Sequence, residues 1–217
     1  MTARAQKFIS ILVGAVILVL LLPVLNCWPR SRIIPEMKAK AAMKQAYQIH
    51  QALYAAAQDN IGGEFPSKNA DGSACTTSNE AYRQLFVRGL IDDEKLFYVQ
   101  GSAWHAGVKV DGDMGDAASN FSNALAKNEN HWAYVSGLNT ISTPVDIPIV
   151  TDGSSEVPGV WGKDPSQKGG VWKGRFQIVV RVGGQARVYD ATEVDRPIPL
   201  MDQIKAVPGA KFLNPDG

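Results

Sequence analysis

The strongest constraint in this sequence is an uninterrupted apolar segment near its amino end. The eighteen residues from Phe8 to Leu25 carry no charge, and Ser10 is their only polar side chain. As an α-helix the segment would be about 27 Å long, close to the roughly 30 Å hydrocarbon core of a bilayer. Because it is apolar on every face, it fits a membrane better than the core of a globular domain. We therefore predict a cytoplasmic stretch over residues 1–7 and a transmembrane helix over residues 8–25.

Two other targeting signals are partly present. Arg4 and Lys7 resemble the positive start of a secretory signal peptide, but no small-residue cleavage site follows and the apolar segment is long for such a peptide. Cys27, which follows Val24-Leu25-Asn26, offers a lipoprotein acceptor with an unusual Asn before the cysteine. Both signals are alternatives to a permanent membrane anchor.

Charge is divided unevenly along the 217 residues. The net charge is +1, but residues 1–44 carry seven Lys/Arg and one acid, whereas residues 45–217 carry fifteen Lys/Arg and twenty acids. A total this close to neutral disfavours a dedicated nucleic-acid binder, so we expect no nucleic-acid partner. The basic residues after the apolar segment are placed to meet lipid headgroups. Two basic residues precede the segment and five follow it by residue 44, so a positive-inside count leaves the topology open.

Residues 26–62 are predicted to hold an amphipathic juxtamembrane helix. Pro35 suits its first turn, and Gly62-Gly63 stops it after Asn60. Its apolar residues are spaced three and four apart, as on one face of a helix. They are Ala39, Ala42, Ala46, Ile49, Leu53 and Ala56.

Residues 63–217 are predicted to form an α/β head. A short helix is expected over residues 79–88, capped by Ser78 and closed by Gly89, with strands over 132–135 and 147–150. The clearest strand pair is 176–182 and 185–190, joined by Gly183-Gly184. A two-residue turn with positive φ at both glycines would place Val180 opposite Arg187 and Val179 opposite Val188. Residues 101–130, rich in Gly, Ser, Asn and Asp, are predicted to be a surface excursion.

Several short segments of the chain together carry a resemblance to a known family. The apolar segment ends in LLLPVL (residues 20–25), and the basic, alanine-rich helix ends in QDNIGGEFP (58–66). The head contains LIDDEKLF (90–97), HWAYVSGL (131–138) and PIVTDG (148–153). Together these segments resemble the type II secretion pseudopilins and related type IV pilin-like proteins.

The resemblance implies an α+β, pilin-like fold. A long N-terminal helix, with a membrane-spanning half and an amphipathic half, would pack on a small antiparallel β-sheet head. It also implies a non-enzymatic structural subunit of a type II secretion or type IV pilus-like system. Such a subunit is a single-pass protein of the bacterial inner membrane with its head in the periplasm or outside the cell. Its partners would be membrane lipid, sister pilin-like subunits and secretion-system components. Assembly would use the apolar helix, including Phe8, Leu12, Val16, Leu20 and Pro23.

The sequence departs from the family at the prepilin cleavage motif. Lys7, not Gly, precedes Phe8, and the first acidic residue is Glu36, where the family usually has a Glu five residues into the mature chain. The alternative function is therefore a membrane-anchored extracytoplasmic binding module that keeps the pilin fold without assembling into filaments.

Candidate ligand and catalytic residues are few. Asp111, Asp113 and Asp116 lie in a Gly-rich loop whose carboxylates are calcium-ligand candidates, although the spacing is not that of an EF-hand. A solvated acidic turn is the alternative, and no other cofactor is expected. His50, His105 and His131 have no partner at metal-ligand spacing. No nucleophile or phosphate-loop motif is present, so we expect no enzymatic activity.

Overall fold

The computed structural model describes residues 30–105, 107–108, 110–190 and 200–216. The chain divides into two units after Lys38, and the second unit, residues 39–217, contains the head. The elements in chain order are α2 (Arg30–Gln58), α3 (Ser78–Val87), the 3-10 turns η1 (Glu94–Phe97), η2 (Ala103–His105) and η3 (Ala117–Ser119), β1 (Trp132–Ser136), β2 (Pro148–Asp152), β3 (Phe176–Arg181), β4 (Ala186–Asp190), α4 (Leu200–Lys205) and β5 (Lys211–Leu213).

The head is built on a five-stranded antiparallel sheet with strand order β4-β3-β2-β1-β5. All residues of β1 and β2 are buried, which is typical of strands covered on both faces. The strands predicted over 132–135 and 147–150 are confirmed, whereas α4 and β5 were not predicted. The molecule is therefore α+β, with one long helix preceding the sheet.

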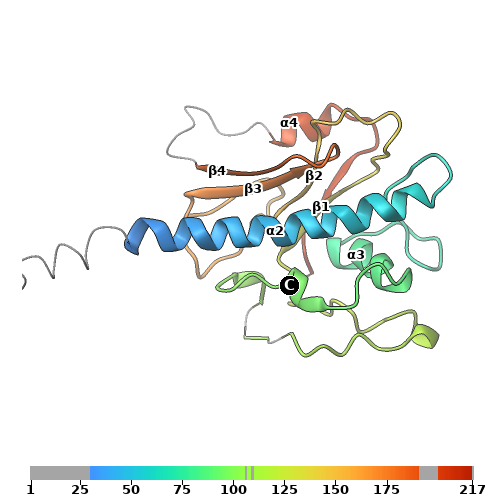
Figure 1. The fold of residues 1–217 in the computed structure, drawn as a ribbon, viewed down its shortest axis with the longest axis horizontal. Helices are drawn as coiled ribbons and strands as arrows, with labels where there is room; N and C mark the ends of the chain where they lie inside the picture. Colours follow the sequence, from blue (N-terminus) through green and yellow to red (C-terminus); the bar gives the residue numbers. More distant parts are fainter. Residues whose placement is uncertain (1–29, 106, 109, 191–199, 217) are drawn as a thin grey trace, which may run out of the picture. The chain divides into compact units, whose positions relative to one another are not determined.

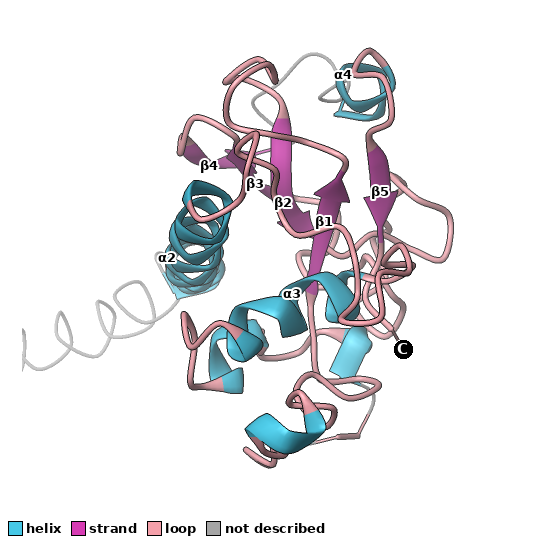
Figure 2. Cartoon of the chain, turned by 90° about the vertical axis from the view of Figure 1, so that its right-hand side faces the viewer, coloured by secondary structure: helices cyan, strands magenta, loops and turns pink. Residues whose placement is uncertain are grey.

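From Ala39 onward, α2 lies across one face of the sheet (Figure 1, Figure 2). The predicted apolar stripe is confirmed, since each of its six residues is at most 3% exposed. Its alanines allow a close approach of backbone to backbone. Side chains fix the position of α2: His50 Nε2 donates to the Val182 carbonyl oxygen at 3.0 Å, and Arg88 Nη1 donates to the Ala56 carbonyl oxygen at 3.0 Å.

The predicted pilin-like architecture, with a membrane-spanning half in the long helix, is wrong for the part of the chain that the structure describes. No helix there is long and apolar enough to cross a membrane. The physical reason is that α2 carries Lys, Glu or Gln in nearly every turn and is apolar along one stripe only. The transmembrane prediction over residues 8–25 lies outside the described residues, as do the assembly residues Phe8, Leu12, Val16, Leu20 and Pro23.

Local signals placed the helix ends only approximately. Helix α2 begins at Arg30, so Pro35 lies inside it and not in its first turn. Helix α3 is capped by Thr77 and not by Ser78. The Thr77 side chain accepts from the Glu80 amide, and the Glu80 carboxylate accepts from the Thr77 amide at 3.3 Å. This reciprocal pair is a capping box, in which the cap and the acid three residues later satisfy each other's backbone amides.

The β3–β4 hairpin forms as predicted, but its register differs by one residue. Val180 pairs with Ala186, and Val179 pairs with Arg187. Only Gly184, at φ +81°, has a positive φ in the connection. The Arg181 amide donates to the Gln185 carbonyl oxygen, so three residues, not two, form the loop. A single left-handed glycine at the end of a three-residue loop is the usual alternative to the two-residue turn.

Candidate functional site

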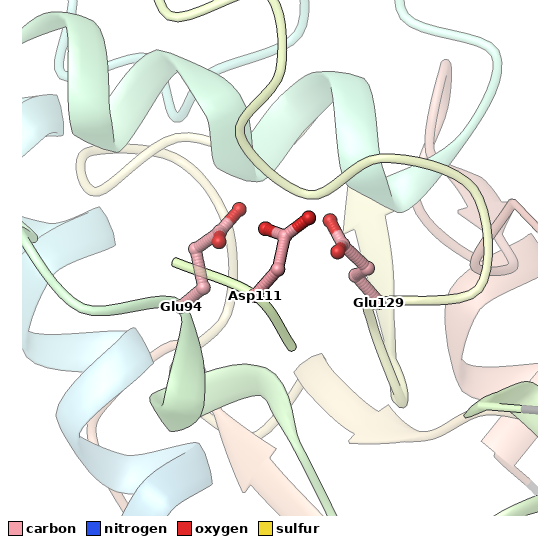
Figure 3. A group of neighbouring side chains, drawn as sticks. All are labelled: Glu94, Asp111 and Glu129. Carbon is pink, nitrogen blue, oxygen red and sulfur yellow. The ribbon is translucent and has the colours of Figure 1, made fainter. Parts of the chain in front are cut away.

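The site with the most unusual chemistry is a group of three carboxylates from separate segments of the head. Glu94 begins η1, Asp111 lies in the excursion between η2 and η3, and Glu129 lies three residues before β1. One carboxylate oxygen from each lies within 4.8 Å of the others. Figure 3 shows the three side chains approaching one another from these separate segments.

Two of the three carboxylates are removed from water. Glu94 is 1% exposed and Glu129 is 3% exposed, while Asp111 is exposed. Burial raises the pKa of both glutamates, and the neighbouring negative charges raise it further. Backbone hydrogen bonds oppose this rise in pKa. They come from the Leu125 and Gly112 amides to Glu94 and from the Ala126 amide to Glu129. All the charged groups that raise these two pKa values are carboxylates. Asp111 and Asp113 act on Glu94, while Glu94, Asp111 and Asp113 act on Glu129.

Backbone amides hold one oxygen of each carboxylate. Glu94 Oε1 accepts from the Leu125 amide at 2.6 Å, and Glu129 Oε2 accepts from the Ala126 amide at 2.7 Å. Asp111 Oδ1 accepts from the Asp113 amide at 2.8 Å. In contrast, Glu94 Oε2 is buried and has no hydrogen-bond partner. The arrangement fixes the orientation of the carboxylates and leaves a second oxygen of each for another ligand.

Only one of the three aspartates predicted as calcium-ligand candidates lies in this cluster. Asp111 belongs to the cluster, but Asp113 and Asp116 do not. Asp113 accepts from the Gly115 amide and from Asn123, and Asp116 caps η3 by accepting from the Ser119 amide at 2.8 Å. Their oxygens are thus occupied by the turns of their own loop. Sequence reasoning missed both glutamates, because neither lies at short spacing from the aspartates of the loop.

Two of the three histidines, which come from different segments of the sequence, lie close together. The rings of His105 and His131 have their centroids 6.4 Å apart. His131 Nδ1 lies 2.7 Å from Ser102 Oγ, and its Nε2 lies 3.0 Å from Asp152 Oδ1. The ring is reversed relative to a hydrolase triad, where the serine faces Nε2. Asp152 also accepts from the Ile178 amide at 2.6 Å. We interpret this series of hydrogen bonds as a buried link that joins the excursion and the start of β1 to strands β2 and β3.

His50 lies apart from these two, in a groove beside α2. The groove has a volume of about 490 Å³ and lies between α2 and the β3–β4 turn. His50 is 5% exposed, and its Nδ1 has no hydrogen-bond partner. Tyr47 and Tyr54, 40% and 44% exposed, flank its ring with centroids 6.2 and 6.1 Å away. Burial lowers the pKa of His50, so its ring is neutral at physiological pH.

Comparison with known proteins adds no family to these observations. No family model, no curated protein and no solved structure matches this chain. The resemblance to secretion pseudopilins therefore stays a prediction from the sequence, and the function has to be argued from the chain itself.

Proposed function

We propose that this chain is a non-enzymatic structural subunit of a type II secretion or type IV pilus-like system. The apolar segment 8–25 anchors it in the bacterial inner membrane, and the α+β head stands in the periplasm. Its partners are membrane lipid, sister subunits and components of the secretion system.

The observation that supports this proposal is that one face of α2 is buried against the head while two tyrosines outside that face are exposed. Within the head, the alanine stripe is buried in the core, while Tyr47 and Tyr54, which lie outside the stripe, stay 40% and 44% exposed. Tyrosines seven residues apart lie on one side of a helix, about 10.5 Å apart along its axis. Exposed tyrosines are enriched where proteins contact one another, because the ring is apolar and its hydroxyl tolerates water. The helix that follows the anchor in the sequence thus offers a surface to a neighbouring subunit.

Site-specific crosslinking tests this proposal. In a Cys27→Ser background, Gln48→Cys places a thiol on the exposed side of α2, and Asp202→Cys places a matched thiol on α4. A thiol-reactive crosslinker on intact inner membranes should join the Gln48→Cys protein to pilin-like subunits and leave the Asp202→Cys protein uncrosslinked. Protease added to spheroplasts should digest the head. A protected head, or equal crosslinking from both positions, would contradict the proposal.

A second candidate function is a membrane-anchored binding module that does not assemble. The observation in its favour is the groove beside α2, where the buried His50 Nδ1 lacks a donor. Since Nε2 donates to Val182, Nδ1 carries a lone pair that a bound hydroxyl or amide group would satisfy. This candidate predicts a chain that stays monomeric in the membrane and gives no crosslink from Gln48→Cys. The same experiment therefore separates the two functions.

A further inference from the structure

We propose that Glu94, Asp111 and Glu129 bind one calcium ion, which joins η1 and the excursion to the start of β1. Nothing in the proposed structural function requires such an ion, and the inference stands independently of it.

The spacing of the carboxylates suits calcium. Calcium–oxygen distances are about 2.3–2.6 Å, so two oxygens on opposite sides of one ion lie up to about 5 Å apart. The candidate ligand atoms of the three residues lie within 4.8 Å of one another. Magnesium, with oxygens at about 2.0–2.1 Å, limits opposite ligands to roughly 4.2 Å and demands an octahedral arrangement. Carboxylates drawn from three separate segments suit calcium better, because its coordination tolerates irregular geometry whereas magnesium demands a near-ideal octahedron.

An independent observation is the orphaned oxygen of Glu94. Glu94 is 1% exposed, and its Oε2 has neither a protein donor nor access to water. A buried carboxylate oxygen without a partner carries a large desolvation penalty, which a metal ion removes. Among the described residues, the charged groups that act on the Glu94 carboxylate include no arginine or lysine to provide this compensation. The Glu94 side chain that carries this oxygen points toward Asp111 and Glu129, where a cation would contact it (Figure 3).

The rest of the site is organised for an ion to enter. Amides hold one oxygen of each carboxylate, which fixes the side chains without neutralising their charge. Asp111 is exposed, so the ion can arrive from solvent and keep water molecules in the remaining positions of its six- to eightfold coordination. Three carboxylates supply the charged oxygen ligands whose number sets the affinity of a calcium site.

Binding and stability measurements on the full-length chain in a nonionic detergent test the inference. After treatment with EDTA, calcium titration by calorimetry should show one saturable site, and calcium should raise the melting temperature. Magnesium at the same concentration should raise it less. Glu94→Gln and Glu129→Gln should each lower calcium affinity by at least about tenfold, because each removes a charged ligand. Asp116→Asn is the matched control in the same loop and should bind calcium like the wild type.

The glutamine variants also separate a ligand from a merely structural residue. Glutamine keeps the acceptor for the Leu125 amide but removes the buried charge. Without calcium, Glu94→Gln should therefore melt at or above the wild-type temperature, while its response to calcium disappears. The inference is overturned if calcium shows no saturable binding, if the Glu94→Gln and Glu129→Gln proteins bind it as tightly as the wild type, or if magnesium stabilises the protein equally.

Discussion

His105 makes the stability of the head depend on pH in a way that one substitution isolates. The imidazole is 5% exposed, and its Nε2 accepts from the Val99 amide at 3.2 Å while Nδ1 donates to the Asn128 carbonyl oxygen at 3.2 Å. The ring of Tyr98 packs on it, and the ring of His131 lies beyond. Burial, followed by the electrostatic interaction with His131, lowers the pKa of His105 from 6.5 to about 4, although the hydrogen bond to Asn128 opposes the shift.

The sign and size of the effect follow from this shift. The unfolded chain takes up the proton near pH 6.5, whereas the folded chain resists it until about pH 4. The stabilisation is therefore complete above pH 6.5, is lost progressively as the pH falls to about 4, and does not change below that. At 1.36 kcal/mol for each pKa unit, the lost stability is about 3 kcal/mol.

The experiment compares the wild type with His105→Gln, whose amide retains one donor and one acceptor but does not titrate. Urea unfolding of the full-length proteins in detergent, followed by fluorescence of the buried tryptophans at fixed calcium, gives the free energy of unfolding at each pH. Between pH 6.5 and pH 4 the wild type should lose about 3 kcal/mol more than the variant. Raised carboxyl pKa values elsewhere are common to both proteins and cancel in the difference. A difference between the two proteins that is constant with pH would refute the reasoning.

Three further experiments test the packing, one cap and one turn. Leu53→Ala, at a fully buried position of α2, should cost about 2–5 kcal/mol of unfolding free energy, whereas the exposed Tyr54→Ala should cost well under 1 kcal/mol; equal costs would contradict the assigned faces. Thr77→Ala should cost about 1 kcal/mol by removing the capping box, and an unchanged urea midpoint would show that the cap is unimportant. Gly137→Ala should cost about 1–3 kcal/mol more of unfolding free energy than Gly209→Ala. Both glycines have positive φ, but only at Gly137 would an added methyl group collide with backbone, namely the Gly209 carbonyl. The reverse order would contradict this geometry.

The buried side of α2 was predictable because its signal is local. The spacing of Ala39, Ala42 and Ala46, continued by Ile49, Leu53 and Ala56, fixes one helical face whatever lies against it, and all six residues are buried. What the spacing does not encode is which strands cover the stripe. Strand β5, at the sheet edge beside β1, comes from the last residues described, and its three residues carry no period that separates strand from loop.

The error in hairpin register has a different origin. Two adjacent glycines permit positive φ at both positions, and the two-residue turn uses both. Here Gly183 keeps a negative φ, and a side chain added there would lie 2.9 Å from Val145 Cβ. The Gly183 amide donates to the Val145 carbonyl oxygen, so the loop that precedes β2 holds this residue in place. A tertiary contact thus selected one of two turns that the local sequence allows equally.

The carboxylate cluster was beyond sequence reasoning for a physical reason that applies to sites of this kind. A search for calcium loops seeks acids at short, fixed spacing, and it finds Asp111, Asp113 and Asp116. Short-range acids are the ones whose oxygens bind the amides of their own turn, as Asp113 and Asp116 do. Glu94 and Glu129 lie 17 and 18 residues from Asp111 in the sequence. Turns with unusual backbone angles, such as Leu125 at φ +51°, set the path of the chain between Asp111 and Glu129. Only the fold of the intervening chain brings these two glutamates to Asp111, and the same separation hides them from any pattern of spacing.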